Sequence, residues 1–364
     1  MLKAHSPVVI RFGRLGDTVM LQPLLRKLHL RYGSPCRLLA LGNWPQVLYS
    51  AQPAVGGFIP LKSQYGPLWL HPQRWSAVLA LHRMCESPFY ICEPELRTRT
   101  KVRPMLALAG VPTSHCVFIE DTPTLSSEHW VDWLLRFGNT TPAAFRTLAL
   151  APAITPVAAP QLHVSVAERA ERDAWLQAQG LTGVPLVLLQ PTNKRTMRWN
   201  GVRRAEDDDK AWPMERWIEL AHAIRQRLPQ AHILFCAAPA EQAYLEQLLG
   251  RAATGSAGFS AAALPLGRLK ALMEIAHSMV SVDTGPAHLA AAVGCALVVL
   301  FGARSPSRWV PRSASGSAVA VVGGQPFVRR VDEIDTAQVM AAWCRVAHCI
   351  IAEASASVSD EAAR

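Results

Sequence analysis

Residues 280–292 read VSVDTGPAHLAAA, and they predict a buried strand, a tight turn and the start of a helix. Thr284 suits the N-cap position, Gly285 permits close approach of the backbone, and Pro286 suits the first helical position. A second apolar run, 296–301, follows the helix. The result is a βαβ unit with an open helix N-terminus at the end of its strand, where an anionic phosphate binds well. A plain helix cap in an α/β domain explains the same residues, so both interpretations stay open here.

The composition is that of a globular protein large enough for two domains. The chain has 364 residues, of which 50% are hydrophobic and 18% are charged. No apolar run reaches the roughly 20 residues that a membrane-spanning helix needs, and the first residues carry no signal-peptide cleavage pattern. We therefore expect a cytoplasmic protein. The cysteines are scattered with no CxxC pair, which predicts core packing and no metal site.

The net charge of +10 favours an acidic partner, that is, nucleic acid, anionic lipid, or a phosphorylated or carboxylated substrate. Much of the positive excess lies in the first 110 residues. No RNA- or DNA-binding motif accompanies it, so we expect no nucleic-acid partner.

Strands alternate with helices along the chain, which indicates parallel sheets. In the first half, strands are predicted at 7–12, 36–41, 57–61, 77–81 and 116–119. In the second half, they are predicted at 185–189, 232–236, 279–282, 296–301 and 318–322. Residues 150–161 are rich in Pro and Ala and show no periodicity, which predicts a linker between two domains. A long terminal helix is expected at 334–350.

A second polar turn follows the first predicted strand, at Gly13-Arg14-Leu15-Gly16-Asp17. It matches neither GxGxxG nor a P-loop, so neither dinucleotide binding nor Walker chemistry is supported. Asp17 begins a helix, where its carboxylate is either an N-terminal cap or a general base projected into a cleft.

The stretch 191–209 is an unusual polar loop with basic residues followed by a run of acidic ones. Most of it is interpreted as a solvated surface insert. Its two ends differ, because 191–193 closes a strand and 210–213 opens a helix.

Three elements together resemble glycosyltransferase family 9, which contains the ADP-heptose:lipopolysaccharide heptosyltransferases. They are Arg11 to Asp17, Lys210 with Trp212-Pro213, and Ser281 to Leu289, and the similarity spans residues 7 to 312. Two departures are the long loop at 191–209 and the Ala/Gly/Ser-rich region 251–264, where a clearer strand is expected. The resemblance implies an α/β fold of the GT-B type, in which the parallel sheets of two Rossmann-like domains face a central cleft.

On this basis we expect an acceptor-binding domain at 1–160, which includes the start of the linker, and a nucleotide-sugar-binding domain at 161–333. The helix at 334–352 is expected to pack back toward the first domain. The tail at 353–364 is expected to fray.

The activity that the resemblance implies is an inverting, metal-independent transfer of a sugar from a nucleotide-diphosphate donor, without a cofactor. Asp17 would be the general base that removes a proton from the acceptor hydroxyl. Lys210 would act in catalysis as a cation on the donor's phosphate or sugar. Thr284 and Gly285 would hold the diphosphate at the helix N-terminus.

Five further assignments complete the donor site that the family implies. Asp283 would bind sugar hydroxyls, and Thr192 would be a second phosphate contact. Glu241 is placed to meet the ribose, and Leu264 to line the adenine pocket. His288 is either a phosphate contact or a packed histidine one turn into the helix.

The acceptor implied by the family is an anionic lipopolysaccharide core at the cytoplasmic face of the inner membrane. Basic side chains of the first domain match its carboxylates and phosphates: Arg14, Arg83, Arg97, Arg99, Lys101 and Arg103. For any one of them taken alone, a solvated helix face is the preferred explanation, and the same charge could hold the domain against anionic lipid. A monomer is expected.

Three rivals remain at this stage. The first is a family member that uses another nucleotide sugar or acceptor. The second is a catalytically silent module that keeps the fold for binding, against which the presence of Asp17, Lys210 and Asp283 argues. The third is a nucleotide-sugar epimerase of similar architecture.

Overall fold

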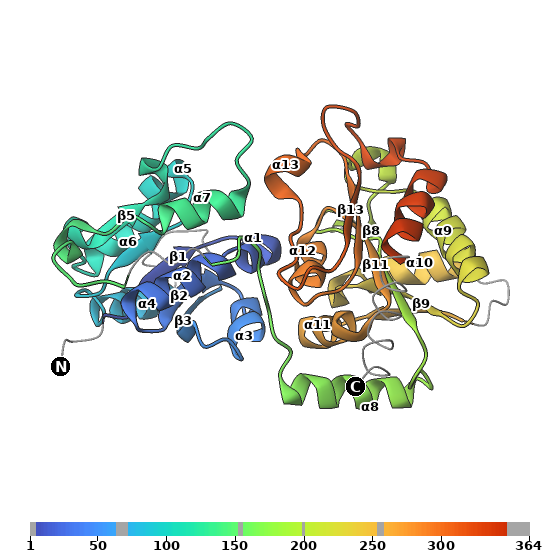
Figure 1. Cartoon of the computed structure of the whole chain (residues 1–364), viewed down its shortest axis with the longest axis horizontal. Coiled ribbons are helices and arrows are strands. Elements are labelled where there is room, and N and C mark those ends of the chain that lie inside the picture. Colours follow the sequence, from blue (N-terminus) through green and yellow to red (C-terminus); the bar gives the residue numbers. More distant parts are fainter. Residues whose placement is uncertain (1–4, 63–71, 152–155, 199–200, 253–257, 348–364) are drawn as a thin grey trace, which may run out of the picture. The chain divides into compact units, whose positions relative to one another are not determined.

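The computed structural model describes residues 5–62, 72–151, 156–198, 201–252 and 258–347. The chain divides into two compact units, at 1–162 and 163–364 (Figure 1). Each unit is an α/β layer structure around its own parallel sheet, and each is described by itself below. The tail predicted at 353–364 lies outside the described residues.

The first unit contains a five-stranded sheet in which every strand pairs in parallel with its neighbours. Its strand order is β3-β2-β1-β4-β5. The strands are β1 (Val8–Arg11), β2 (Cys36–Leu41), β3 (Val55–Leu61), β4 (Phe89–Ile91) and β5 (Cys116–Phe118). The chain moves outward from β1 in one direction and then returns to its other side, so the strand order reverses between β1 and β4. Ligands of open α/β sheets bind at such a reversal, beside the carboxyl ends of the strands.

Helices connect these strands. They are α1 (Leu15–Met20), α2 (Gln22–Tyr32), α3 (Trp44–Tyr49), α4 (Pro72–His82), α5 (Glu95–Arg97), α6 (Arg103–Leu108) and α7 (Trp130–Phe137). A π-helical turn, Thr98–Val102, joins α5 to α6. Single π turns inside helices are frequent at functional sites.

The strand predicted at 77–81 is wrong, because these residues lie in α4. The buried residues of α4 are Arg74, Ala77, Val78 and Leu81, which is the spacing of one helical face. The short apolar run in this segment fits a strand and a buried helix face equally well. The fourth strand is instead β4, whose three residues are all buried.

The second unit contains a six-stranded parallel sheet in the order β10-β9-β6-β11-β12-β13. The strands are β6 (Leu186–Gln190), β9 (His232–Ala237), β10 (Phe259–Ala263), β11 (Ser278–Val282), β12 (Leu297–Phe301) and β13 (Val319–Gly323). The order reverses between β6 and β11. The region 251–264, which lacks a clear strand pattern in the sequence, supplies the edge strand β10.

The helices of the second unit are α8 (Val166–Ala178), α9 (Met214–Arg227), α10 (Gln242–Ala252), α11 (Leu266–Ile275), α12 (Gly285–Ala292), α13 (Pro306–Trp309) and a helix at 336–347. Within the long polar loop, β7 (Met197–Arg198) and β8 (Gly201–Val202) form a small antiparallel pair. The loop is therefore partly structured.

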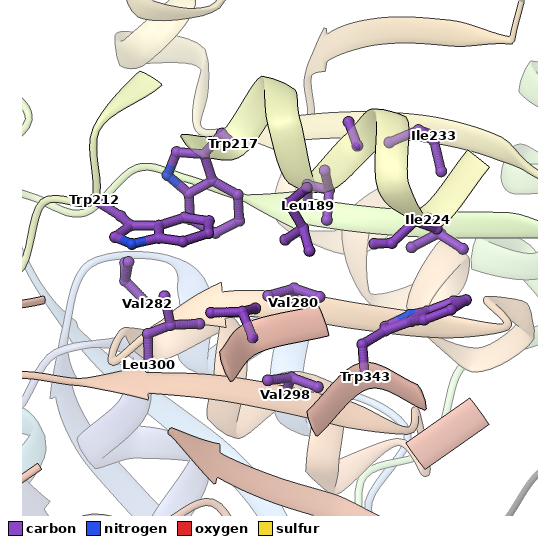
Figure 2. Packing of buried hydrophobic residues seen from close by; sticks show 14 of the residues in the cluster. Leu189, Trp212, Trp217, Ile224, Ile233, Val280, Val282, Val298, Leu300 and Trp343 are labelled. Carbon is purple, nitrogen blue, oxygen red and sulfur yellow. The ribbon is translucent and has the colours of Figure 1, made fainter. Parts of the chain in front are cut away.

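One large apolar core fills one face of the second sheet (Figure 2). Val280 and Val298 from the sheet and Trp217 and Trp343 from the helices belong to this one cluster, and all four are almost fully buried. The Nε1–H of Trp343 donates to Ser278 Oγ at 2.9 Å. Residues 336–347 of the predicted terminal helix contribute their apolar face to this core.

Candidate active site

The first site element is the turn between β1 and α1 at the strand reversal of the first sheet. A Cβ atom added at Gly13 would lie 2.4 Å from Asp17 Cβ and 2.9 Å from Arg11 Nε. Only a glycine fits there without displacing both side chains. The Arg14 N–H donates to Asp17 Oδ2 at 2.9 Å. The Asp17 carboxylate, at the third position of α1, therefore accepts a hydrogen bond from the N-cap residue and places negative charge at the helix N-terminus.

Asp17 is also held by an arginine from the end of β1. Arg11 Nη2 donates to Asp17 Oδ1 at 2.7 Å, and the Asp17 side chain keeps 24% of its exposure. Arg11 itself is buried, and its Nη1 donates to the Cys92 carbonyl at 2.7 Å. Its guanidinium lies 5.0 Å from the ring centre of Trp130, which is cation–π distance. Arg11 and the Arg14 N–H thus orient the Asp17 carboxylate, which stays partly exposed.

A second carboxylate, Glu93, lies directly after β4 and is fully buried. It accepts the Phe12 N–H and a hydrogen bond from Arg97 Nη1 at 2.9 Å. Its Oε1 lies 3.8 Å from Arg11 Nη1. Two cations and two anions therefore meet where β1 and β4 end.

Burial and charge oppose each other in this cluster. Burial raises the pKa of the Glu93 carboxyl, and Arg11, the Phe12 N–H and Arg97 oppose that rise. Burial lowers the pKa of the Arg11 guanidinium, but Asp17 and Glu93 outweigh it, so the net pKa shift is upward. Arg11 stays a cation at any ordinary pH.

The basic residues expected to bind the acceptor do not all lie together. Arg97 belongs to the cluster around Glu93. Arg99 and Lys101 lie on the π-helical turn that follows. Arg103 pairs with Glu120 at 3.0 Å and lies 3.8 Å from the ring centre of Phe118. Arg14 is exposed at the start of α1.

Arg83 lies elsewhere. It follows the C-terminal end of α4, at the point where the chain turns to enter β4 from its amino end. The carboxyl ends of the strands are at the opposite edge of the sheet, so Arg83 is not brought to Asp17. Arg83 is expected at a strand end because a strand is predicted at 77–81, and that strand is wrong.

The second site element is the turn between β11 and α12, at the strand reversal of the second sheet. Thr284 is the N-cap, with φ −144° and ψ 172°, and its side chain makes no capping hydrogen bond within the described part of the chain. Its Oγ1 lies 3.3 Å from Ser281 Oγ instead. The first amides of a helix have no intrahelical acceptor, so the start of α12 presents N–H groups and the positive end of the helix dipole.

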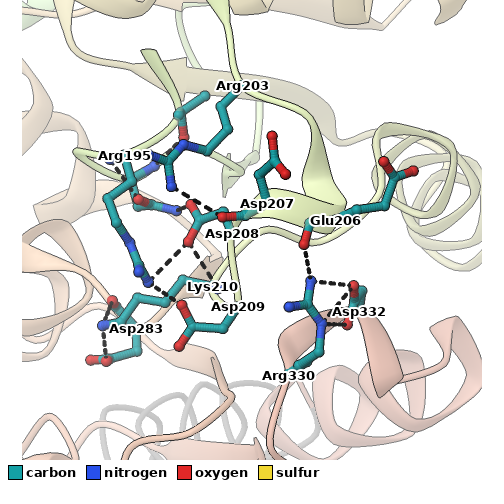
Figure 3. Close-up of polar contacts among 12 residues, drawn as sticks. Arg195, Arg203, Glu206, Asp207, Asp208, Asp209, Lys210, Asp283, Arg330 and Asp332 are labelled. Carbon is teal, nitrogen blue, oxygen red and sulfur yellow. Dashed lines mark hydrogen bonds and ion pairs between the residues drawn. The ribbon is translucent and has the colours of Figure 1, made fainter. Parts of the chain in front are cut away.

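Lys210 is brought to this turn from a distant part of the sequence (Figure 3). Its Nζ donates to the Asp283 carbonyl at 2.9 Å, across 73 positions, and forms an ion pair with the Asp283 carboxylate. A Cβ at Gly302 would lie 2.7 Å from the Asp209 carbonyl, so this glycine lets the segment before Lys210 approach the end of β12. On the other side of Lys210 in the sequence, Trp212 is almost fully buried, and its Nε1–H donates to the Ile334 carbonyl at 2.8 Å.

The loop before Lys210 contributes a buried carboxylate. The interpretation of this loop as a solvated surface insert does not predict it. Asp208 is 1% exposed, and it accepts Asn193 Nδ2 at 2.8 Å and the Lys210 N–H at 3.2 Å. Arg195 Nη2 lies 2.9 Å from Asp208 Oδ1 and also pairs with Asp209 (Figure 3). These contacts fix the backbone that carries Lys210.

Thr192 and Glu241 also meet. Thr192 Oγ1 donates to Glu241 Oε2 at 2.6 Å, and both residues are buried. Burial raises the pKa of Glu241, against the hydrogen bonds from Thr192 and the Ala238 N–H. Leu264 is buried just after β10, and its N–H donates to the Ala237 carbonyl at 2.9 Å.

The residues predicted for a donor therefore come from the carboxyl ends of adjacent strands in the second sheet. Thr192, Lys210, Glu241, Leu264, Asp283, Thr284 and Gly285 follow or face these strand ends. His288 is buried within α12. In the described ranges no group of three or more His, Cys, Asp or Glu side chains could hold a metal ion.

Comparison with solved structures identifies the fold. The ADP-heptose LPS heptosyltransferase II of E. coli matches with a TM-score of 0.68 at 20% identity, covering 96% of this chain and 99% of that one. A glycosyltransferase family 9 protein from Veillonella parvula DSM 2008 matches with a TM-score of 0.70 at 16% identity, covering 95% and 98%. E. coli heptosyltransferase WaaC with ADP matches with a TM-score of 0.56 at 17% identity, covering 92% and 98%. The fold is that of the GT-B glycosyltransferases.

The family follows from the sequence. The family model described as glycosyltransferase family 9 (heptosyltransferase) matches residues 142–335, which is more than half of the chain. No curated protein matches. The chain belongs to glycosyltransferase family 9 and is a glycosyltransferase. This confirms the resemblance read from Arg11–Asp17, Lys210 and Ser281–Leu289.

Proposed function

We propose that this glycosyltransferase moves a heptose from ADP-heptose to a lipopolysaccharide-core acceptor, with inversion at the sugar carbon and without a metal ion. The observation that carries the proposal is the position of Lys210 Nζ, 2.9 Å from the Asp283 carbonyl beside the start of α12, where Thr284 makes no side-chain capping bond among the described residues. A cation and a helix N-terminus together form a site for a diphosphate.

In the proposed reaction the acceptor hydroxyl attacks the anomeric carbon of the donor. A carboxylate oxygen of Asp17 takes the hydroxyl proton, and the new C–O bond forms as the bond from the anomeric carbon to the diphosphate breaks. Attack from the face opposite the leaving group inverts the carbon. Asp17 suits the role because its Oδ1 and Oδ2 are oriented by Arg11 and the Arg14 N–H while the side chain stays partly exposed.

The leaving diphosphate gains negative charge as its bond to the sugar breaks. Lys210 and the N–H groups at the start of α12 are preorganised to stabilise that charge. Asp283 holds Lys210 in place before the donor binds. The same two features supply what a divalent cation supplies in metal-dependent enzymes, which supports transfer without a metal.

The donor identity is proposed from chemistry and from relatives. Two solved structures that share this fold are described as E. coli heptosyltransferase WaaC with ADP and with ADP-2-deoxy-2-fluoro heptose. In this chain, Glu241 would accept hydrogen bonds from the ribose hydroxyls and Leu264 would line the adenine. Thr192 would be a second phosphate contact, and Asp283 would bind sugar hydroxyls.

The acceptor is proposed from charge. Arg97, Arg99 and Lys101 follow the carboxyl end of β4, beside the strand that leads to Asp17. They are suited to the carboxylates and phosphates of an inner-core saccharide. No described helix is long and apolar enough to span a bilayer, and we propose that the basic first unit contacts anionic lipid at the cytoplasmic face of the inner membrane.

The test is a turnover assay with ADP-heptose and truncated core lipid in the presence of EDTA. We expect a heptosylated product and release of ADP, with EDTA having no effect. A parallel panel of nucleotide sugars separates the alternatives, because a uridine donor that turns over faster would contradict ADP-heptose. Sugar product formed without acceptor would identify an epimerase. Tight donor binding without turnover on any acceptor would identify a binding module.

A further inference from the structure

The sequence motifs assign Arg11 and Glu93 no role in the reaction, yet Arg11 pairs with Asp17 and Glu93 lies beside Arg11. Arg11 is 6% exposed and Glu93 is 0% exposed. Charged side chains this deeply buried are rare unless they are paired. Their position at the strand reversal of the first sheet, beside a carboxylate proposed to move a proton, suggests more than a packing role.

The geometry leaves Arg11 little freedom. Its Nη1 donates to the Cys92 carbonyl at 2.7 Å, its Nη2 donates to Asp17 Oδ1 at 2.7 Å, and Trp130 covers its face. Asp17 receives a further hydrogen bond from the Arg14 N–H at 2.9 Å. Arg11 therefore holds one oxygen of the Asp17 carboxylate, and the Arg14 N–H holds the other.

Glu93 in turn weakens the effect of the Arg11 charge on Asp17. Its Oε1 lies 3.8 Å from Arg11 Nη1, and its Oε2 accepts Arg97 Nη1 at 2.9 Å. A cation beside a carboxylate lowers the carboxylate's pKa, and a second anion beside that cation weakens the effect. A base whose pKa is driven too low is a poor proton acceptor.

We infer that Arg11 and Glu93 are positioning residues for Asp17: Arg11 orients the carboxylate and keeps it ionised, and Glu93 keeps it basic. The inference rests on the proposed role of Asp17 as the general base. If the inference is right, loss of the Arg11 cation and loss of the Glu93 anion shift the pKa of Asp17 in opposite directions.

The other groups that face this cluster are not proposed to orient Asp17 or to set its pKa. The Cys92 thiol is fully buried, and burial raises its pKa, so it stays neutral. Arg97 is the one further cation in contact with Glu93 among the described side chains. From α7, Trp130 covers Arg11, and its neighbour His129 accepts the Val131 N–H through Nδ1. From α3, the Tyr49 hydroxyl donates to the Thr18 carbonyl.

The experiment measures the pKa of Asp17 directly, by carboxyl ¹³C NMR titration of the full-length protein, with the Asp17 resonance assigned from the D17N variant. In Arg11→Gln the cation is lost, so the pKa of Asp17 rises by about one unit or more. In Glu93→Gln an anion is lost while shape is retained, so the pKa of Asp17 falls. Arg11→Lys retains the charge and leaves the pKa closer to wild type than Arg11→Gln does.

Matched controls come from a second ion pair in the same unit, Arg136–Glu128, with Nη2 and Oε2 at 2.7 Å. Arg136→Gln and Glu128→Gln should leave the pKa of Asp17 unchanged. General loss of stability cannot move one pKa in opposite directions, so opposite shifts support the inference. Shifts of one sign, or no shift beyond the controls, would overturn it.

The pH dependence of kcat then separates this inference from the proposed function. If Asp17 is the base, the acidic limb of kcat moves up in Arg11→Gln and down in Glu93→Gln, in parallel with the NMR values. If the NMR shifts appear and the acidic limb does not follow them, the positioning is right and the base assignment is wrong. If the limb moves without the NMR shifts, the positioning inference is wrong.

Discussion

Both units have a turn between a strand and a helix at the strand reversal, but the charged side chains at the two turns differ. In the first unit, Asp17 at the third position of α1 supplies the anion itself, and Arg11 pairs with it at 2.7 Å. In the second unit, Thr284 leaves the start of α12 uncapped by its side chain as far as the described residues go, and Lys210 stands beside it.

The difference teaches how one fold provides two chemical environments. A helix N-terminus attracts negative charge. Where the chain provides that charge, the turn becomes a fixed carboxylate that can accept a proton. Where it does not, the turn remains a site for the phosphates of a ligand.

The largest effect is expected from Asp17→Asn. The amide retains the shape of the side chain and can still accept the Arg14 N–H, but it cannot take a proton. We expect kcat to fall by about 10²- to 10⁴-fold and ADP affinity to stay within about twofold, because the donor elements are in the other unit. The measurements are steady-state kinetics and calorimetry. Asp121→Asn, an exposed carboxylate of the same unit, is the control; a parallel loss of ADP binding in Asp17→Asn would contradict the division.

Lys210→Met should damage the second turn. A hydrogen bond to a charged group contributes about 1.5–3 kcal/mol, which corresponds to a loss of ADP affinity of about 10- to 150-fold. The loss in kcat/KM should be at least as large, because the charge on the diphosphate grows in the transition state. Lys194→Met removes an exposed cation of the same loop and should have little effect. Equal losses in the two variants would mean that general loop charge, rather than Lys210, binds the donor.

Gly13→Ala tests how tightly the first turn is built. The added methyl would lie 2.4 Å from Asp17 Cβ, and overpacking of this kind costs about 1–3 kcal/mol. We expect a lower Tm and a lower kcat with ADP affinity retained. Gly250→Ala is the matched control, because a Cβ there meets nothing within 4 Å and alanine favours a helix by up to about 1 kcal/mol. An unchanged Tm in Gly13→Ala would show that the turn is looser than its geometry indicates.

The smallest effect concerns Glu241. Burial raises its pKa, so its carboxylate forms at a higher pH than that of an exposed glutamate. If the ionised carboxylate accepts the ribose hydroxyls, ADP affinity rises a few-fold as the pH increases through that raised pKa. The rise should be missing in Glu241→Gln, and calorimetry between about pH 4.5 and 7.5 compares the two proteins. Identical pH profiles would remove Glu241 from the donor site.

Much of the site could be predicted because the two turns are local in sequence. The turns that carry Asp17 and Thr284 follow buried strands, and glycine and proline in or beside these turns indicate the helix starts. Glu93 shows where this approach fails. It lies just after β4, where a polar side chain at a strand end is a candidate site residue, but the sequence pattern predicts the strand at 77–81 instead of Phe89–Ile91. A three-residue buried strand is too short for a clear periodic signal.

The sequence alone determined the alternation of strands and helices, the two domains and the two turns that carry Asp17 and Thr284. These depend on contacts between near neighbours, which residue type and spacing encode. The contacts between Lys210 and Asp283, 73 positions apart, and between Arg11 and the Cys92 carbonyl, 81 positions apart, depend on the folded chain. Parallel sheets bring distant strand ends to one edge, and strand order, which no local pattern specifies, selects which polar side chains meet there.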